Sequence, residues 1–131
     1  MIQIVKDTRP WFFLQTTHST YGMRVMETGH LEHLYYGERI TVDTQDSAFC
    51  APLVIQRGFA PGNTCTYDRE HPQISMEDVC LEVGTLGRGD IREPFLEVKF
   101  TDGSVTSDFT FDSYEVITLK EREQCLQDSG L

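Results

Sequence analysis

The residues best suited to binding chemistry form a polar and aromatic group in the middle of the chain. The group consists of Arg57, Tyr67, Asp68, Arg69 and His71. Arginine forks and aromatic rings suit sugars, because a guanidinium pairs with hydroxyls in bidentate fashion and the C–H faces of a sugar stack on rings. The alternative is an arginine paired with Asp68 or Glu70 at a loop surface, where charged residues usually lie. Composition alone favours the surface pairing.

Carboxylates are abundant, but none is marked out as catalytic. Glycoside hydrolysis needs two carboxyl groups held at a fixed separation across the bond, whereas Glu77-Asp78 and Glu121-x-Glu123 are expected to be solvated. The pair His30-x-x-His33 lies in strand-like sequence, where residues three apart face opposite sides and do not converge on one ion. The sequence therefore predicts no catalytic acid pair, no metal site and no cofactor.

Charge and length exclude several classes of protein. The 131 residues are enough for one domain but too few for a closed (β/α)₈ barrel, which needs about 200 or more. The chain has 21 Asp and Glu against 11 Lys and Arg, for a formal net charge of −10. A field of that sign repels phosphates, so nucleic acid and anionic membranes are not expected as partners.

The cysteines and the N-terminus predict a cytoplasmic protein. The four cysteines, Cys50, Cys65, Cys80 and Cys125, contain no C-x-x-C pair and are too sparse for a disulfide scaffold, so reduced thiols are expected. The first residues lack a basic region followed by an apolar run, so no signal peptide is recognised. No stretch approaches the roughly 20 apolar residues that span a bilayer.

The elements that must position these residues have the period-two pattern of strands. From Phe95 to Ile117 apolar residues alternate with polar ones around Asp102-Gly103, which predicts a hairpin with Phe100 opposite Val105. Beyond Ser113 the apolar parity switches, which indicates a bulge or bend there.

A second hairpin is expected from Ser19 to Gly37. A Thr28-Gly29 turn would place Met26 opposite Leu31, Met23 opposite Leu34 and Tyr21 opposite Tyr36. Because Thr28 does not adopt a positive φ cheaply, a loop one residue longer is the alternative. Further strands are expected at 11–14 and 39–42, and a weak helix at 119–127. The predicted fold is an all-β, antiparallel β-sandwich, supersandwich-like and incomplete, with at most a short C-terminal helix.

The middle of the chain, from Asp43 to Pro94, carries four prolines and five glycines with little alternation. Connections in compact domains usually run to about 4–6 residues, so long loops of this kind are functional or covered by a partner.

Several motifs together resemble the start of bacterial α-galactosidases of glycoside hydrolase family 36. They are Phe12–Thr16 (FFLQT), Ser19–Met23 (STYGM), Gly29–Gly37 (GHLEHLYYG), Gly87–Pro94 (GRGDIREP), Asp102–Ser104 (DGS) and Thr106–Phe109 (TSDF). They occur in the family's order, and the resemblance extends from about Ile4 to Val116. After Val116 the family pattern fades.

The resemblance implies a large retaining enzyme with an N-terminal β-supersandwich, a central catalytic (β/α)₈ barrel and a C-terminal β-sandwich. That family removes terminal α-galactose from sugars such as melibiose, using two aspartates on the barrel. Because this chain ends before a barrel could begin, neither aspartate is assigned to it, and the chain alone is expected to be inactive.

The resemblance also indicates where this chain would meet substrate. Members of the family are often tetramers in which an N-terminal-domain loop reaches a neighbouring subunit's active site. The matching stretch runs from Phe49 to Arg69, and the substrate-side candidates in it are Phe49, Gln56, Arg57, Phe59, Asp68 and Arg69.

The sequence thus predicts a β-sandwich domain at 1–117 and a C-terminal tail at 118–131 that departs from the family pattern. Its expected role is assembly and shaping of the substrate entrance in an α-galactosidase. The expected partners are the remaining domains or subunits of that enzyme, further copies of the chain, and a galactoside. The alternative is a stand-alone carbohydrate-binding or protein-interaction module.

Overall fold

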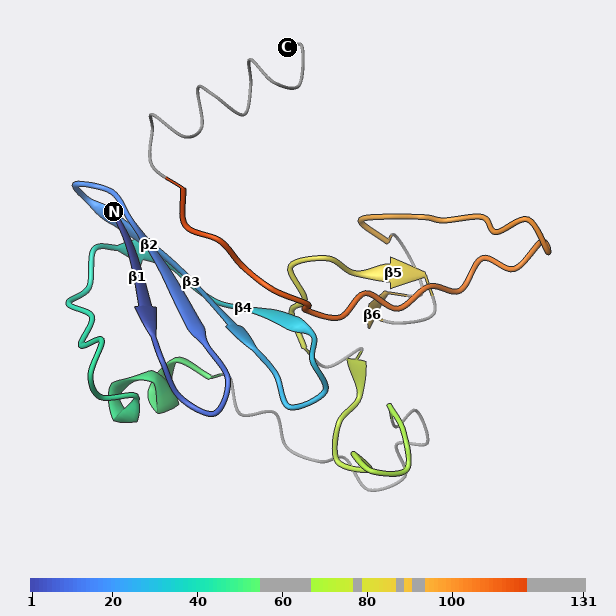
Figure 1. Ribbon diagram of the computed structural model, residues 1–131, viewed down its shortest axis with the longest axis horizontal. Coiled ribbons are helices and arrows are strands. Elements are labelled where there is room, and N and C mark those ends of the chain that lie inside the picture. The colour runs from blue at the N-terminus through green and yellow to red at the C-terminus, as the bar shows by residue number, and fades with distance from the viewer. Residues whose placement is uncertain (55–66, 77–78, 87–88, 91–93, 118–131) are drawn as a thin grey trace, which may run out of the picture.

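The computed structural model describes residues 1–54, 67–76, 79–86, 89–90 and 94–117 and is built around one antiparallel sheet (Figure 1). Four strands lie side by side in chain order: β1 (Ile2–Val5), β2 (Trp11–Gln15), β3 (Ser19–Val25) and β4 (Leu31–Glu38). The all-β, antiparallel class predicted from the sequence is confirmed. The helix expected at 119–127 and the boundary expected at 117/118 lie at or beyond the end of the described residues, and the division of the chain stays a prediction.

One face of the sheet carries the hydrophobic core. Phe13 and Val5 are fully buried there and pack with Val42 and Cys50 from the following segment. That segment ends in a 3-10 helix, η1 (Ala48–Leu53), which the sequence did not predict and which lies below the sheet in Figure 1. The alternation of β2 explains the arrangement, because Phe13 points to the core while Leu14 is exposed on the other side.

The strand expected at 39–42 is wrong, because side chains satisfy the backbone there instead of a neighbouring strand. The main-chain N–H of Ile40 donates to Thr20 Oγ1 at 3.0 Å, and its carbonyl accepts from Gln15 Nε2 at 2.9 Å. Thr20 Oγ1 in turn donates to Gln15 Oε1 at 2.5 Å. This buried network supplies what a sheet ladder would otherwise supply.

The opposite face of the sheet is partly covered by the last described segment. The ring of Phe12 lies 5.0 Å from that of Tyr114, edge to face, and 6.0 Å from that of Phe111. Figure 1 shows this orange-red segment running along the sheet on the side away from η1, before the described residues end at 117.

The hairpin of β3 and β4 is confirmed, with the longer of the two expected loops. The N–H of Met26 donates to the carbonyl of His30 at 2.8 Å, so the loop contains three residues and ends at Gly29, whose φ is +88°. The predicted pairs of Met26 and Met23 are therefore wrong by one residue, since Met23 pairs with His33. A bulge beyond Met23 then restores the register, and Tyr21 lies opposite Tyr36 as predicted.

The expected hairpin at 95–117 is present only as a turn. The N–H of Phe100 donates to the carbonyl of Ser104 at 2.9 Å, which makes a three-residue loop and displaces the predicted partner, Val105. No strand is formed at either side of this turn among the described residues. A two-stranded hairpin is marginal without a third strand or a packed face, and here Phe95 and Phe100 are exposed.

The long middle region contributes short pairings at the edge of the sheet. The N–H of His33 donates to the carbonyl of Cys80 and that of Glu82 to the carbonyl of Leu31, so this segment extends the sheet beyond β4. Next to it lie two very short parallel strands, β5 (Thr85–Leu86) and β6 (Gly89–Asp90). Within the described part of the chain, no helix has the length and apolar character needed to cross a membrane.

Candidate functional site

Three of the six predicted substrate-side residues fall within the described structure. Phe49 is half-buried in η1, where its ring lies 5.7 Å from that of Phe13 and packs against the core. Asp68 and Arg69 are exposed in the segment that begins at Tyr67, well away from η1 in Figure 1. Gln56, Arg57 and Phe59 lie outside the described residues.

Asp68 and Arg69 belong to a closed turn that runs from Tyr67 to Ile74, here called the 67–74 turn. The N–H of Tyr67 donates to the carbonyl of Ile74 at 2.7 Å, and the N–H of Ile74 donates back to His71 at 3.2 Å. Inside the turn, Asp68 Oδ1 accepts the main-chain N–H groups of Glu70 at 2.9 Å and His71 at 2.7 Å. An aspartate that accepts backbone N–H groups two and three residues later is typical of tight turns.

The carboxylate of Asp68 is hydrogen-bonded within the turn. Partial loss of solvent acts to raise the pKa of the Asp68 carboxyl, but hydrogen bonds from the main chain and ring of His71 outweigh it and hold that pKa below its usual value. His71 Nδ1 lies 2.9 Å from Asp68 Oδ1. Among the described residues, Asp68 therefore pairs with His71, and no arginine of that part of the chain pairs with it.

Arg69 remains available for a partner. It lies between Asp68 and Glu70 in the exposed part of the turn, and within the described residues its guanidinium forms no ion pair. A guanidinium in that position can bind two hydroxyls or a carboxylate in bidentate fashion.

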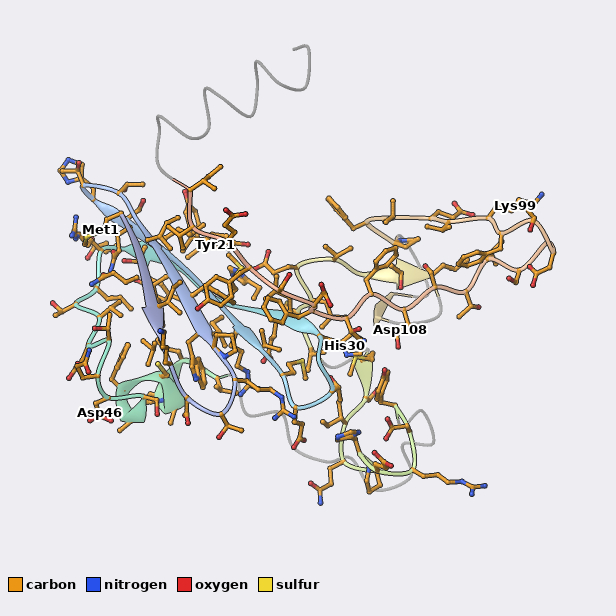
Figure 2. The ribbon with its side chains drawn as sticks, viewed as in Figure 1. Met1, Tyr21, His30, Asp46, Lys99 and Asp108 are labelled. Carbon is orange, nitrogen blue, oxygen red and sulfur yellow. The ribbon has the colours of Figure 1, made fainter. Side chains whose placement is uncertain are left out.

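The 67–74 turn is joined to the sheet through Asp108. The hydroxyl of Tyr67 donates to Asp108 Oδ2 at 2.6 Å, and His30 Nε2 lies 2.5 Å from Asp108 Oδ1. Figure 2 labels His30 and Asp108, which lie next to each other where the β3–β4 turn meets the last described segment. The ring of Tyr67 also packs edge to face on that of His30, at 4.9 Å between centroids.

His30 is held on its other side as well. Its Nδ1 lies 2.8 Å from Thr28 Oγ1, which places a hydroxyl, an imidazole and a carboxylate in series. Hydrolases use that series for catalysis when the hydroxyl and imidazole reach substrate. Here the His30 side chain is only 2% exposed, so the series satisfies a buried imidazole.

His33 contacts a different carboxylate from the one that contacts His30. Its Nδ1 lies 3.2 Å from Glu82 Oε1, while His30 pairs with Asp108. Over the described residues, no group of three or more His, Cys, Asp or Glu side chains could hold a metal ion.

Sequence reasoning missed Asp108 and His30 as partners of the 67–74 turn. Both occur in motifs that carry the family resemblance, but nothing in local spacing joins residues 78 positions apart. The only local signal was the alternation around Gly29, which places His30 at the end of a turn.

Comparisons with known proteins agree on one family. Residues 29–128 match the family model described as the glycosyl hydrolase family 36 N-terminal domain. The chain is 36% identical over 128 residues to the bifunctional alpha-galactosidase/sucrose kinase AgaSK of Mediterraneibacter gnavus, covering 96% of this chain and 13% of that protein. It is 26% identical over 111 residues to alpha-galactosidase AgaA of Geobacillus stearothermophilus, covering 85% of this chain and 14% of that protein.

Solved structures give the same result. The alpha-galactosidase from Lactobacillus brevis superposes with a TM-score of 0.69 at 30% identity, over 85% of this chain and 14% of that chain. The galactosidase domain of AgaSK superposes with a TM-score of 0.65 at 28% identity, over 86% of this chain and 15% of that chain. The chain thus spans 13–14% of the length of the curated relatives that it matches.

Proposed function

Because this chain belongs to the glycosyl hydrolase family 36 N-terminal domain family, we propose that it acts as the N-terminal β-sandwich domain of an α-galactosidase. The observation that carries the proposal is the family match over residues 29–128, together with its relatives named as alpha-galactosidases. The reaction is hydrolysis of terminal α-galactosides, and the catalytic acids lie in a barrel domain outside this chain.

The role of this chain within that enzyme is to shape the substrate entrance. The exposed 67–74 turn supports this role, since Arg69 is exposed there and pairs with no carboxylate of the described residues, while Asp68 accepts N–H groups within the turn. Within the stretch from Phe49 to Arg69, it is Arg69 that reaches the active site and binds sugar hydroxyls there, whereas Phe49 packs against the core.

The second role is assembly into an oligomer. In the described part of the chain, no strand pairs with β1 on the side away from β2. Apolar side chains are also exposed elsewhere, on β4 and in the segment that leads to the 100–104 turn, with Tyr36 72% and Phe95 79% accessible. Open strand edges and apolar surface favour pairing with further strands, from the rest of the enzyme or from another copy. We place the protein in the cytoplasm, where the free thiols Cys50 and Cys80 stay reduced.

Hydrolysis of an aryl α-galactoside tests the function. The enzyme that contains this domain together with a family 36 barrel is expected to release the aryl group, and the purified 131-residue chain is expected to release none. Turnover by the chain alone would contradict the placement of the catalytic acids outside it. Absence of turnover by the whole enzyme would contradict the proposed reaction.

Arg69→Ala tests the entrance role, with Arg39→Ala as the matched control because Arg39 is also an exposed arginine of this domain. Arg69→Ala is expected to raise the KM of the whole enzyme about tenfold, the effect of losing one charged hydrogen bond. Equal KM values for the two variants would contradict the role of Arg69. Sedimentation tests assembly, and a stable monomer at high concentration would contradict it.

A further inference from the structure

We propose that Asp108 and Tyr67 are positioning residues that hold the 67–74 turn, and with it Arg69, at a fixed place on the sheet. This inference rests on the proposed role of Arg69 at the substrate entrance. It adds residues that touch no substrate and that act through Arg69.

Asp108 is suited to this role because its two carboxylate oxygens bind two different parts of the molecule. Oδ1 faces His30 Nε2 at 2.5 Å and Oδ2 accepts the Tyr67 hydroxyl at 2.6 Å. A carboxylate engaged at both oxygens has its plane fixed, and hydrogen bonds to a charged acceptor are stronger than neutral ones. Asp108 therefore links the 67–74 turn to the start of β4.

The anchor on the sheet side is rigid. His30 is buried, and Thr28 Oγ1 lies 2.8 Å from its Nδ1, so both ring nitrogens are engaged. The segment that carries Asp108 is also fastened to the same turn by its backbone, because the N–H of Phe111 donates to the carbonyl of Gly29 at 2.7 Å. Asp108 and His30 are thus held together by main-chain and side-chain bonds.

The anchor on the turn side is fixed by two different contacts. The Tyr67 hydroxyl reaches Asp108, and the Tyr67 ring packs edge to face on His30 with an interplanar angle of 88°. These contacts define both the position and the orientation of Tyr67. An aromatic pair of this geometry is favourable beyond the apolar area that it buries.

Tyr67 determines where Arg69 lies, because the two are only two residues apart in the same turn. The Tyr67–Ile74 backbone bond closes the turn, and the Asp68 carboxylate fixes the N–H groups of Glu70 and His71. Arg69 lies between these fixed points, so a shift of Tyr67 moves the backbone from which its guanidinium extends. A displacement of about 1 Å at a binding group can cost about a hundredfold in an enzyme.

The test compares two single-atom changes that remove the same kind of bond. Tyr67→Phe deletes the hydroxyl that donates to Asp108, and the matched control Tyr21→Phe deletes a hydroxyl that donates to Glu82 at a similar distance, away from the 67–74 turn. In the whole enzyme, Tyr67→Phe is expected to raise KM about tenfold with kcat little changed, and Tyr21→Phe to leave KM unchanged.

A second comparison separates positioning from a general structural effect. In an Arg69→Ala background, Tyr67→Phe is expected to produce no further rise in KM, because the residue it positions is gone. Independent, multiplicative effects of the two changes would overturn the inference. So would an equal response of KM to Tyr67→Phe and Tyr21→Phe.

Amide hydrogen exchange tests the same inference without activity. Tyr67→Phe is expected to speed exchange of the Glu70 and His71 amides about tenfold, whereas Tyr21→Phe leaves them unchanged. Unchanged exchange in Tyr67→Phe would overturn the proposal whether or not the enzyme is active. If only the proposed function were wrong, the whole enzyme would be inactive, but Tyr67→Phe would still speed exchange of the Glu70 and His71 amides.

Discussion

The hydroxyl of Tyr21 lies 2.6 and 2.7 Å from the two oxygens of the Glu82 carboxylate, although 61 residues separate the two in sequence. The pair joins the middle of β3 to the segment that lengthens the sheet beyond β4. His33 completes the cluster, since its ring lies 5.0 Å from that of Tyr21 and its Nδ1 lies 3.2 Å from Glu82. This contact attaches part of the irregular middle region to the sheet.

The titration of Tyr21 is expected to differ from that of an ordinary tyrosine. Burial first, and then the hydrogen bond and charge of Glu82, raise the pKa of Tyr21 to about 12 from the usual 10.0. The folded protein thus holds this proton more tightly than the unfolded chain, so the stabilisation is complete below about pH 10 and is lost as the pH rises through about 12.

Ultraviolet titration checks this behaviour. Tyr21 is expected to ionise only near pH 12, and this late component should be missing in Tyr21→Phe. Glu82→Gln should shift the component toward lower pH, because it removes the negative charge. A complete titration of all tyrosines below about pH 11 would be incompatible with the Tyr21–Glu82 pair.

Two glycines with the same backbone angle are expected to differ in importance. Gly29 and Gly103 both have φ of +88°, where an L-residue costs about 1–2 kcal/mol. A Cβ on Gly29 would also lie 3.4 Å from Thr110, whereas one on Gly103 would meet nothing within 4 Å. Gly29 ends the turn between two paired strands, but Gly103 lies in a turn without strands at its sides.

Urea unfolding of the two alanine variants measures the difference. Gly29→Ala is expected to lower the free energy of unfolding by about 1–2 kcal/mol, and Gly103→Ala by less than half of that, because its turn can open without unpairing the sheet. Gly29→Asn should cost less than Gly29→Ala, since asparagine tolerates positive φ. Equal losses for the two alanine variants would refute the distinction.

The alternating pattern of the sequence is sufficient for the class of fold and for β3 and β4, and the apolar run 11–14 predicts β2. It also identified the two turns, because Gly29 and Gly103 mark positions of positive φ. The register was less accessible: a loop one residue longer and a bulge beyond Met23 cancel each other, so Tyr21 and Tyr36 were paired correctly while the residues nearer the turn were not.

The remaining differences depend on partners far away in sequence. The 39–42 segment has the composition of a strand, but its backbone is satisfied by Gln15 and Thr20. The 95–117 segment alternates regularly up to Ser113, yet alternation creates a strand only where a neighbouring strand and a face to cover exist. The junction of His30, Asp108 and Tyr67 joins three separate segments, and no period in the sequence contains that information.

The ion pair of Arg24 and Glu32 is expected to matter more than an exposed pair. Arg24 Nε lies 2.5 Å from Glu32 Oε2, and the Glu32 side chain is only 6% exposed. The guanidinium also lies 5.4 Å from the centre of the Trp11 ring. Removing one partner of a buried pair leaves the other charge without compensation, which typically costs about 3–5 kcal/mol.

Thermal unfolding of three variants separates these contributions. Arg24→Met is expected to lower stability by about 3 kcal/mol, and Arg24→Lys by less, because lysine keeps the charge but loses the fork and most of the stacking. The control Arg39→Met removes an exposed guanidinium that donates to the carbonyl of Thr16, and its cost should stay below about 1 kcal/mol. If Arg24→Met lowered stability no more than Arg39→Met does, the buried Glu32 carboxylate would not depend on Arg24 for compensation.

The two described thiols are expected to react very differently. Cys50 is completely buried in the core, and burial first, with the charges of Asp7 and Asp46 in addition, raises its pKa to about 11. Cys80 is exposed at the edge of the sheet. The thiolate is the reactive form of cysteine, and at pH 8 only about a thousandth of Cys50 is ionised. Its burial also keeps the reagent from reaching the sulfur.

Iodoacetamide labelling, followed by mass spectrometry of the separate cysteine peptides, measures both rates in one experiment. Cys80 is expected to be labelled in the folded protein at least about a hundredfold faster than Cys50, and the two should converge in denaturant. Cys80→Ser should leave the Cys50 rate unchanged, which controls for exchange between the thiols. Since Cys50 contacts the same core as Phe13 and Val5, its labelling reports opening of that face of the sheet; rapid labelling under native conditions would mean that the segment carrying η1 does not stay packed on the sheet.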